Sequence, residues 1–168
     1  MLLFLHVAVS IVGLLTGVLV VSGLLRNQRL EGWTAVFLAT TFATSASGYL
    51  FHSHMIGPPQ IVGGVSLVTL GLALYALYVR RLAGPWRITY VVSAVLAFYL
   101  NAFVGVVQAF DKVALLHALA PKGSGPVFAL AQVALFALFG GLGFRAVKRF
   151  HPEPLSEAET PSTRRQRT

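Results

Sequence analysis

Five long stretches of the sequence carry no Asp, Glu, Lys or Arg. They cover residues 2–25, 33–52, 59–79, 88–110 and 126–144. A helix rises about 1.5 Å per residue, so about 20 apolar residues cross the hydrocarbon core of a bilayer. Hydrophobic residues make up 56% of the chain and charged residues 11%, which is more apolar surface than a soluble domain of this size buries. The sequence therefore predicts an all-α integral membrane bundle of five transmembrane helices.

The first stretch is expected to stay in the mature protein as a membrane helix. A secretory signal peptide has a basic start and an apolar run of about 7–15 residues. Here no basic residue precedes the run, the run is longer, and Arg26 and Arg29 follow it. These features favour a retained helix over a cleaved signal.

Basic residues fall at alternate joints between the stretches. Only Lys112 and Lys122 follow the fourth stretch, and no Lys or Arg follows the second. Since loops rich in Lys and Arg stay in the cytoplasm, we expect the N-terminus outside and the C-terminus in the cytoplasm. The other basic residues, all at the joints assigned to the cytoplasm, are Arg26, Arg29, Arg80, Arg81, Arg87, Arg145, Lys148, Arg149, Arg164, Arg165 and Arg167.

The chain divides into a five-helix transmembrane domain at residues 1–150 and a polar tail at residues 151–168. The tail is interrupted by proline and has no apolar period, so we expect a disordered cytoplasmic segment. Residues 111–121 allow two interpretations, because DKVALLHALA either extends the fourth helix or forms a short helix at the membrane interface.

Four of the five histidines are expected on the outer side. His6 lies just inside the first helix, His52 and His54 end the second, and His117 lies in the outer joint. Imidazole binds haem iron, copper and zinc, and the thioether of Met55 suits copper. This periplasmic-side histidine group predicts haem b held by His6 and His52, or a copper or zinc ion held by members of the whole set. The alternative is that each histidine hydrogen-bonds to water or backbone near the headgroups.

Four amides fall within the apolar stretches, and three of them, in the fourth and fifth stretches, are candidates for a polar path. Asn101 and Gln108 share a face of the fourth helix, and Gln132 lies in the fifth. They could line a path through the membrane, which predicts a channel or facilitator for a small or neutral solute. The alternative is hydrogen bonding between packed helices.

Small and polar residues form stripes on the first two helices. At helical spacing they would let helices or a flat cofactor approach closely. The GxxxG of the first helix and the Gly140-Gly141-Leu142-Gly143 segment also favour association, so we expect a homo-oligomer or a subunit of a membrane complex. The stripes comprise His6, Ser10, Gly13 and Gly17 on the first helix, and Thr41, Thr44, Ser45, Gly48 and His52 on the second.

Several functional classes lose support from what the sequence lacks. None of the five stretches contains a carboxylate, which disfavours proton-coupled pumps and cation transporters. Neither a GxSxG nor an HExxH motif is present. The chain has no cysteine, so a disulfide or thiolate metal site is excluded. The basic residues follow membrane topology, so no nucleic-acid partner is expected.

Residues 77–121, LYVRRLAGPWRITYVVSAVLAFYLNAFVGVVQAFDKVALLHALAP, resemble a family of small uncharacterised multi-spanning membrane proteins of bacteria. The resemblance extends over all five stretches but not the tail. It implies a multi-pass protein of the bacterial inner membrane and carries no activity. The layout is also similar to membrane b-type cytochromes, but their histidine pairs do not match here.

These observations leave three hypotheses of function. The first is a haem- or metal-binding protein with redox or metal-handling work at the periplasmic face, in contact with a quinone or a periplasmic partner. The second is a channel or facilitator that uses the three amides. The third is an accessory subunit or scaffold of a larger membrane complex. Whether the protein is an enzyme stays open.

Overall fold

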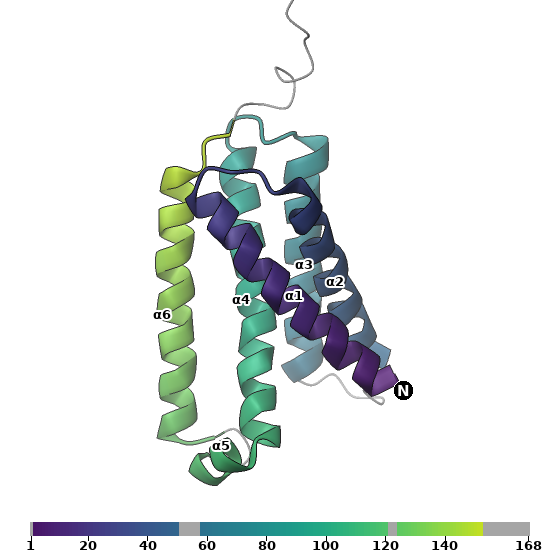
Figure 1. Ribbon diagram of the computed structural model, residues 1–168, viewed down its shortest axis with the longest axis vertical. Coiled ribbons are helices and arrows are strands. Elements are labelled where there is room, and N and C mark those ends of the chain that lie inside the picture. Colours follow the sequence, from purple (N-terminus) through teal and green to yellow (C-terminus); the bar gives the residue numbers. More distant parts are fainter. Residues whose placement is uncertain (1, 51–57, 121–123, 153–168) are drawn as a thin grey trace, which may run out of the picture.

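The computed structural model describes residues 2–50, 58–120 and 124–152, and every regular element in these ranges is helical. Figure 1 shows the long helices side by side. The elements are α1 (Leu2–Leu25), α2 (Glu31–Leu50), α3 (Pro58–Leu74), the π-helix η1 (Tyr75–Val79), α4 (Trp86–Lys112), α5 (Ala114–Leu119) and α6 (Pro126–Arg149).

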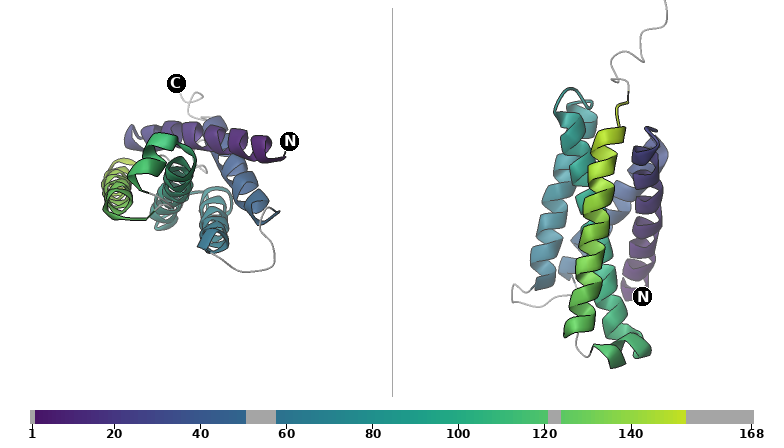
Figure 2. Two further views of the ribbon diagram at one scale, coloured as in Figure 1. Left: turned by 90° about the horizontal axis from the view of Figure 1, so that it is seen from below. Right: turned by 90° about the vertical axis from the view of Figure 1, so that its left-hand side faces the viewer.

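Helix α4 is the centre of the bundle. It contacts α1, α2, α3 and α6, and α1 also contacts α2 and α6. The end view in Figure 2 shows α3, α4 and α6 in a row, with α1 lying across it. In Figure 1, α1 crosses the row obliquely, from α6 at one end toward α2 at the other.

Four helical segments are long and apolar enough to cross a membrane. They are Phe4–Leu25, Gln60–Val79, Trp86–Lys112 and Pro126–Arg149, with mean hydropathies between 1.9 and 2.4. The remaining long helix, α2, has 20 residues and carries the Thr and Ser stripe, and it is not among these four segments. The all-α fold and its multi-pass membrane character therefore agree with the sequence prediction.

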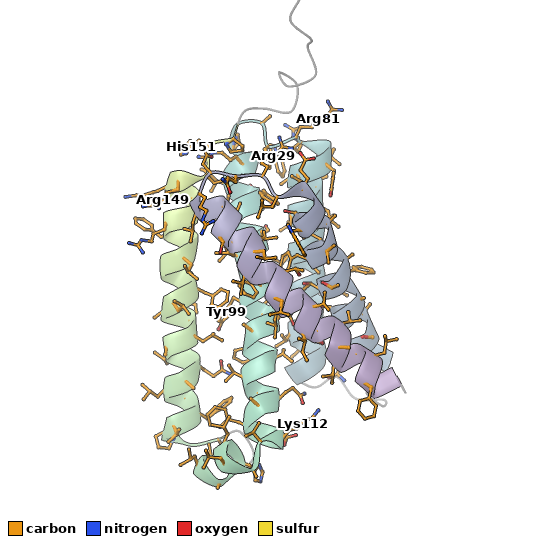
Figure 3. All side chains as sticks on the ribbon, in the orientation of Figure 1. Arg29, Arg81, Tyr99, Lys112, Arg149 and His151 are labelled. Atoms are coloured by element: carbon orange, nitrogen blue, oxygen red, sulfur yellow. The ribbon has the colours of Figure 1, made fainter. Side chains whose placement is uncertain are left out.

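The two ends of the bundle differ in charge. Arg29, Arg81 and Arg149 are labelled at one end in Figure 3 and Lys112 at the other. The α1–α2 loop, the η1–α4 loop and the end of α6 meet at the first of these, which we call the basic end. Among the described residues, Lys112 is the only Lys or Arg at the opposite end, which we call the His6 end. The predicted alternation of charge is thus present in the fold.

Helix α4 ends at Lys112 and does not continue unbroken through the residues that follow. Val113 is extended, at φ −88° and ψ 115°, and separates α4 from the six-residue α5. Leu115 and Leu119 of α5 are 73% and 57% exposed. Residues 114–119 therefore form a short helix separate from α4 at the His6 end (Figure 1), and its position at a membrane interface stays a prediction.

The apolar core lies mainly toward the basic end. It includes Val20 and Leu24 of α1, Phe37 of α2, Leu70 of α3 and Val91 of α4. Rings reinforce its middle: Phe98 packs edge-on against Phe139 at a centroid distance of 4.9 Å and against Phe37 at 6.2 Å. The core is therefore apolar in this half, whereas the uncharged polar side chains of α1, α2 and α4 gather in the other half.

The GxxxG of α1 marks the point where this helix crosses its neighbours. A Cβ on Gly17 would lie 2.5 Å from the Phe98 ring, and one on Gly13 would lie 2.9 Å from the Asn101 amide. Glycine is needed at position 17, because a Cβ there would meet the Phe98 ring, whereas at position 13 the Asn101 side chain would have to shift. The motif is therefore used inside the chain, and the expectation that it promotes association finds no support at this face.

Candidate functional site

The candidate site begins with contacts between α1 and α2 at the His6 end. Nδ1 of His6 lies 2.7 Å from the Ser47 hydroxyl, and Ser10 lies 3.4 Å from Thr44. The Ser47 hydroxyl donates to the Thr44 carbonyl at 3.1 Å, so its oxygen can accept the Nδ1 proton of His6. This arrangement fixes the imidazole between the two helices.

Two cavities adjoin this contact. The wider, of about 340 Å³, lies between α1 and α4, and the narrower, of about 120 Å³, lies among α2, α3 and α4. The residues that line both are His6, Thr44, Gly48, Asn101, Val104 and Gln108. Because six residues are shared, we treat the two cavities as one site and call it the His6 cavity.

Asn101 is the most deeply placed amide of the His6 cavity. Its side chain is 8% exposed, and its Nδ2 is buried without a hydrogen-bond partner in the described part of the chain. The Thr41 hydroxyl, which lies beside Gly13 as Asn101 does, is also buried without a partner there. Leaving a buried polar group unpaired costs about 1–3 kcal/mol. The site therefore holds unsatisfied hydrogen-bonding capacity deep between the helices.

The walls of the wider cavity are apolar on the lipid side. Val7 and Ile11 of α1 line it and are 40% and 51% exposed on the surface of the bundle. Leu14 and Val104 also line it, and Lys112 lies at its rim near the end of α4. A molecule dissolved in the membrane could reach the polar groups of the cavity between α1 and α4.

The narrower cavity is bordered by a contact between α2 and α3. The Ser45 hydroxyl donates to the Ser66 hydroxyl at 3.1 Å, and Ser66 is 4% exposed. Gln60 and Gly63 of α3 line the same space. Polar residues of four helices therefore converge on the His6 cavity.

The predicted site residues have different outcomes. His6, Asn101 and Gln108 line one cavity, although the sequence analysis had placed only the two amides on a common face. His117 is exposed on α5 and lines neither cavity. The other three predicted ligands, His52, His54 and Met55, lie outside the described residues.

Gln132 lies apart from the other two amides of the predicted polar path. The Gln132 amide of α6 donates to the Phe103 carbonyl of α4 at 3.5 Å, and Gln132 lines neither part of the His6 cavity. Asn101 and Gln108 share that cavity, as their common helix face predicted. The packing interpretation therefore fits Gln132, whereas the other two amides line open space.

In residues 2–50, 58–120 and 124–152, no group of three or more His, Cys, Asp or Glu is arranged to hold a metal ion. The donors around His6 are instead hydroxyl and amide groups, which hydrogen-bond and rarely bind transition metals. A haem or metal site that includes His52 stays a prediction, because His52 is not among the described residues.

Sequence reasoning missed the partners of His6. Ser47 and Ser66 face His6 and Ser45 only because of the angle at which the helices cross, and no spacing within one helix reveals that angle. No family model, curated protein or solved structure matches this chain. The function therefore has to be inferred from the residues of the His6 cavity.

Proposed function

We propose that the chain spans the bacterial inner membrane five times, with α2 as the fifth span beside the four more apolar helices. Helix α2 is 20 residues long, or about 30 Å. Its polar side chains turn toward neighbouring helices, with Ser47 on His6 and Ser45 on Ser66. Its lipid-facing side carries Val36 and Phe42, which are 40% and 52% exposed. A helix with this distribution is apolar where lipid would touch it.

The orientation we propose places the basic end in the cytoplasm. All described Lys and Arg residues except Lys112 lie at that end. The positive-inside rule then puts the N-terminus and the His6 cavity on the periplasmic side. The cavity would open to the outer leaflet of the membrane.

We further propose that the His6 cavity binds the headgroup of a lipid-soluble carbonyl compound of the quinone class. The observation that carries this proposal is the buried Nδ2 of Asn101, which has no partner among the described residues. A carbonyl oxygen is the simplest acceptor for that donor. Binding would give the buried N–H a hydrogen-bond acceptor and remove the cost of about 1–3 kcal/mol for leaving it unpaired.

The size and walls of the cavity also support a quinone headgroup. A cavity of about 150 Å³ holds benzene in a well-studied protein. The wider part alone, at about 340 Å³, has room for a substituted six-membered ring. Gln108 and His6 supply further polar groups, and the exposed Ile11 lies where an apolar tail would leave for the lipid.

Titration of the purified protein with a short-tailed 1,4-benzoquinone tests this function. We expect saturable binding that Asn101→Leu weakens about 2- to 10-fold, as expected for loss of one hydrogen bond. Gln132→Leu is the matched control, since it also removes an amide from a membrane helix but lies outside the cavity. Equal weakening in both variants, or no saturable binding by the wild type, would exclude the proposal.

The same preparation tests the haem and metal hypotheses. Haem held by His6 and His52 would give a visible absorbance band, and a copper or zinc ion would appear in metal analysis. In either case His6→Ala should remove the signal. Colourless, metal-free protein that still binds the quinone would leave the headgroup site as the function of this cavity.

A further inference from the structure

A separate cavity of about 270 Å³ lies at the basic end, at the opposite end of the bundle from His6. Its walls come from the end of α1, the α1–α2 loop, the start of α2, η1 and the loop after it, α4, and the residue after α6. The proposed function leaves this space unused. We call it the Arg29 cavity, after the single basic residue that lines it.

Arg29 is held with part of its guanidinium unpaired. One terminal nitrogen bonds the Glu31 carboxylate at 2.7 Å, and the Arg29 side chain is 19% exposed while that of Glu31 is 73% exposed. The Nε of Arg29 is buried and has no hydrogen-bond partner in the described part of the chain. A guanidinium offers its N–H groups as a planar fork that fits phosphate and carboxylate oxygens. One prong of the fork is thus unpaired in the described part of the chain.

The rest of the Arg29 cavity is mostly apolar. Val20, Leu24, Leu82 and Phe150 line it, and each is at most 6% exposed. Its volume exceeds the roughly 150 Å³ that encloses a benzene molecule, but it is too small for a whole lipid. It suits the first part of one acyl chain next to a polar headgroup.

The surroundings are strongly positive. Glu31 is the only acidic side chain at this end among the described residues, and it already pairs with Arg29. The basic side chains of the neighbouring loops, and of the start of α4, are Arg26, Arg80, Arg81 and Arg87. Clustered Lys and Arg at a membrane surface attract anionic headgroups. The local field therefore favours an anionic ligand over a zwitterionic one.

We propose that the Arg29 cavity binds an anionic membrane phospholipid, with the headgroup phosphate on the Arg29 fork and part of one acyl chain against Leu24 and Phe150. The phosphate oxygen accepts from Nε, and Glu31 keeps the terminal nitrogen in place. The ligand chemistry is a phosphate joined to an apolar chain, which neither free phosphate nor a neutral lipid supplies.

Calorimetric titration of the full chain in neutral detergent tests this site. The probes are dioctanoyl phosphatidylglycerol, dioctanoyl phosphatidylcholine and inorganic phosphate. We expect phosphatidylglycerol to bind at least tenfold more tightly than either of the others. Equal binding of inorganic phosphate would show a free-anion site, and equal binding of phosphatidylcholine would show that the acyl chain alone decides; both results overturn the proposal.

Two variants of the α1–α2 loop, each of which removes one positive charge, test whether binding depends on Arg29 itself. Arg29→Gln should weaken phosphatidylglycerol binding about tenfold or more, since charge-assisted bonds are lost. Arg26→Gln removes the same charge from an exposed position of the same loop and should change binding less than twofold. Arg29→Lys keeps the charge but lacks the fork, and should weaken binding too. Equal effects of Arg29→Gln and Arg26→Gln would reduce the site to diffuse attraction and refute it.

Retention of quinone binding in Arg29→Gln shows that the variant is folded. The His6 cavity lies at the other end of the bundle, so its affinity should not change. If the quinone analogue does not bind the wild type, an unchanged free energy of unfolding shows instead that Arg29→Gln is folded. Failure of the lipid proposal can then be told apart from failure of the quinone proposal.

Discussion

Replacing Gly17 by alanine should destabilise the bundle, because Gly17 lies against the Phe98 ring where α1 crosses α4. A Cβ at this position would lie 2.5, 2.7 and 2.9 Å from three ring carbons of Phe98. The ring cannot move aside easily, because Phe37 and Phe139 hold it from other sides and it is 7% exposed. Either α1 must move away from α4 or the aromatic cluster must repack.

The size of the effect follows from two opposing contributions. Alanine is favoured over glycine in a helix by about 1 kcal/mol. Overpacking a well-packed core costs about 1–3 kcal/mol. Gly71→Ala is the matched control, since a Cβ there meets nothing within 4 Å among the described residues. We therefore expect Gly17→Ala to be less stable than Gly71→Ala by about 1–3 kcal/mol.

Equilibrium unfolding in mixed micelles, from mild detergent toward SDS, measures the difference. A double variant sharpens it: Phe98→Leu should make room for the new methyl, so Gly17→Ala should cost less in that background. If Gly17→Ala stabilises the protein as much as Gly71→Ala, α1 does not cross α4 at Gly17. The position of His6 beside Ser47 would then lose its structural basis, because the same crossing sets both.

Two further predictions concern the basic end and the topology. Arg87 donates to the carbonyls of Val147, at 3.0 Å, and of Phe150, so Arg87→Gln should destabilise the end of α6 by about 1.5–3 kcal/mol, seen as faster hydrogen exchange there. Arg145 is exposed, so Arg145→Gln should change stability by less than about 0.5 kcal/mol. Equal effects of the two variants would show that the bonds from Arg87 to the carbonyls do not hold the end of α6. Single cysteines at positions 81 and 112, in a chain without native cysteine, should react with impermeant thiol reagent from opposite sides of the membrane. Labelling of both from one side would refute the proposed topology.

The membrane helices were accessible to sequence analysis because their determinants are local. Length and lack of charge identified the apolar stretches, and their order places basic joints at one end. The break at Val113 was one of two interpretations of this segment, and periodicity could not choose between them because both predict helix on either side of the break. For α2 the sequence gives too little. The mean hydropathy of a helix does not tell on which side its hydroxyl groups lie, and here Ser45 faces Ser66 of α3.

The candidate site was predicted in its residue types and missed in its pairing. The small-residue stripe of α1 and the amide face of α4 were visible at helical spacing, and they do meet, with Gly13 against Asn101. His6 contacts Ser47 of α2, which the sequence analysis did not name, and the pairing of His6 with His52 stays a prediction. Crossing angles between helices decide such pairs. The Arg29 cavity was missed for a related reason, because it forms only where several loops and helix ends meet. From the sequence, Arg29 was interpreted only as a sign of membrane orientation.

Photoaffinity labelling would locate a bound quinone on the chain. An azido-substituted short-tailed benzoquinone, bound to the purified protein, should attach to the segments that line the wider cavity, at residues 6–14 of α1 and 101–112 of α4. Excess unlabelled quinone should suppress this labelling, and Asn101→Leu should reduce it. Label confined to the lipid-exposed face of α6, insensitive to competition and to Asn101→Leu, would contradict a quinone headgroup site in the His6 cavity.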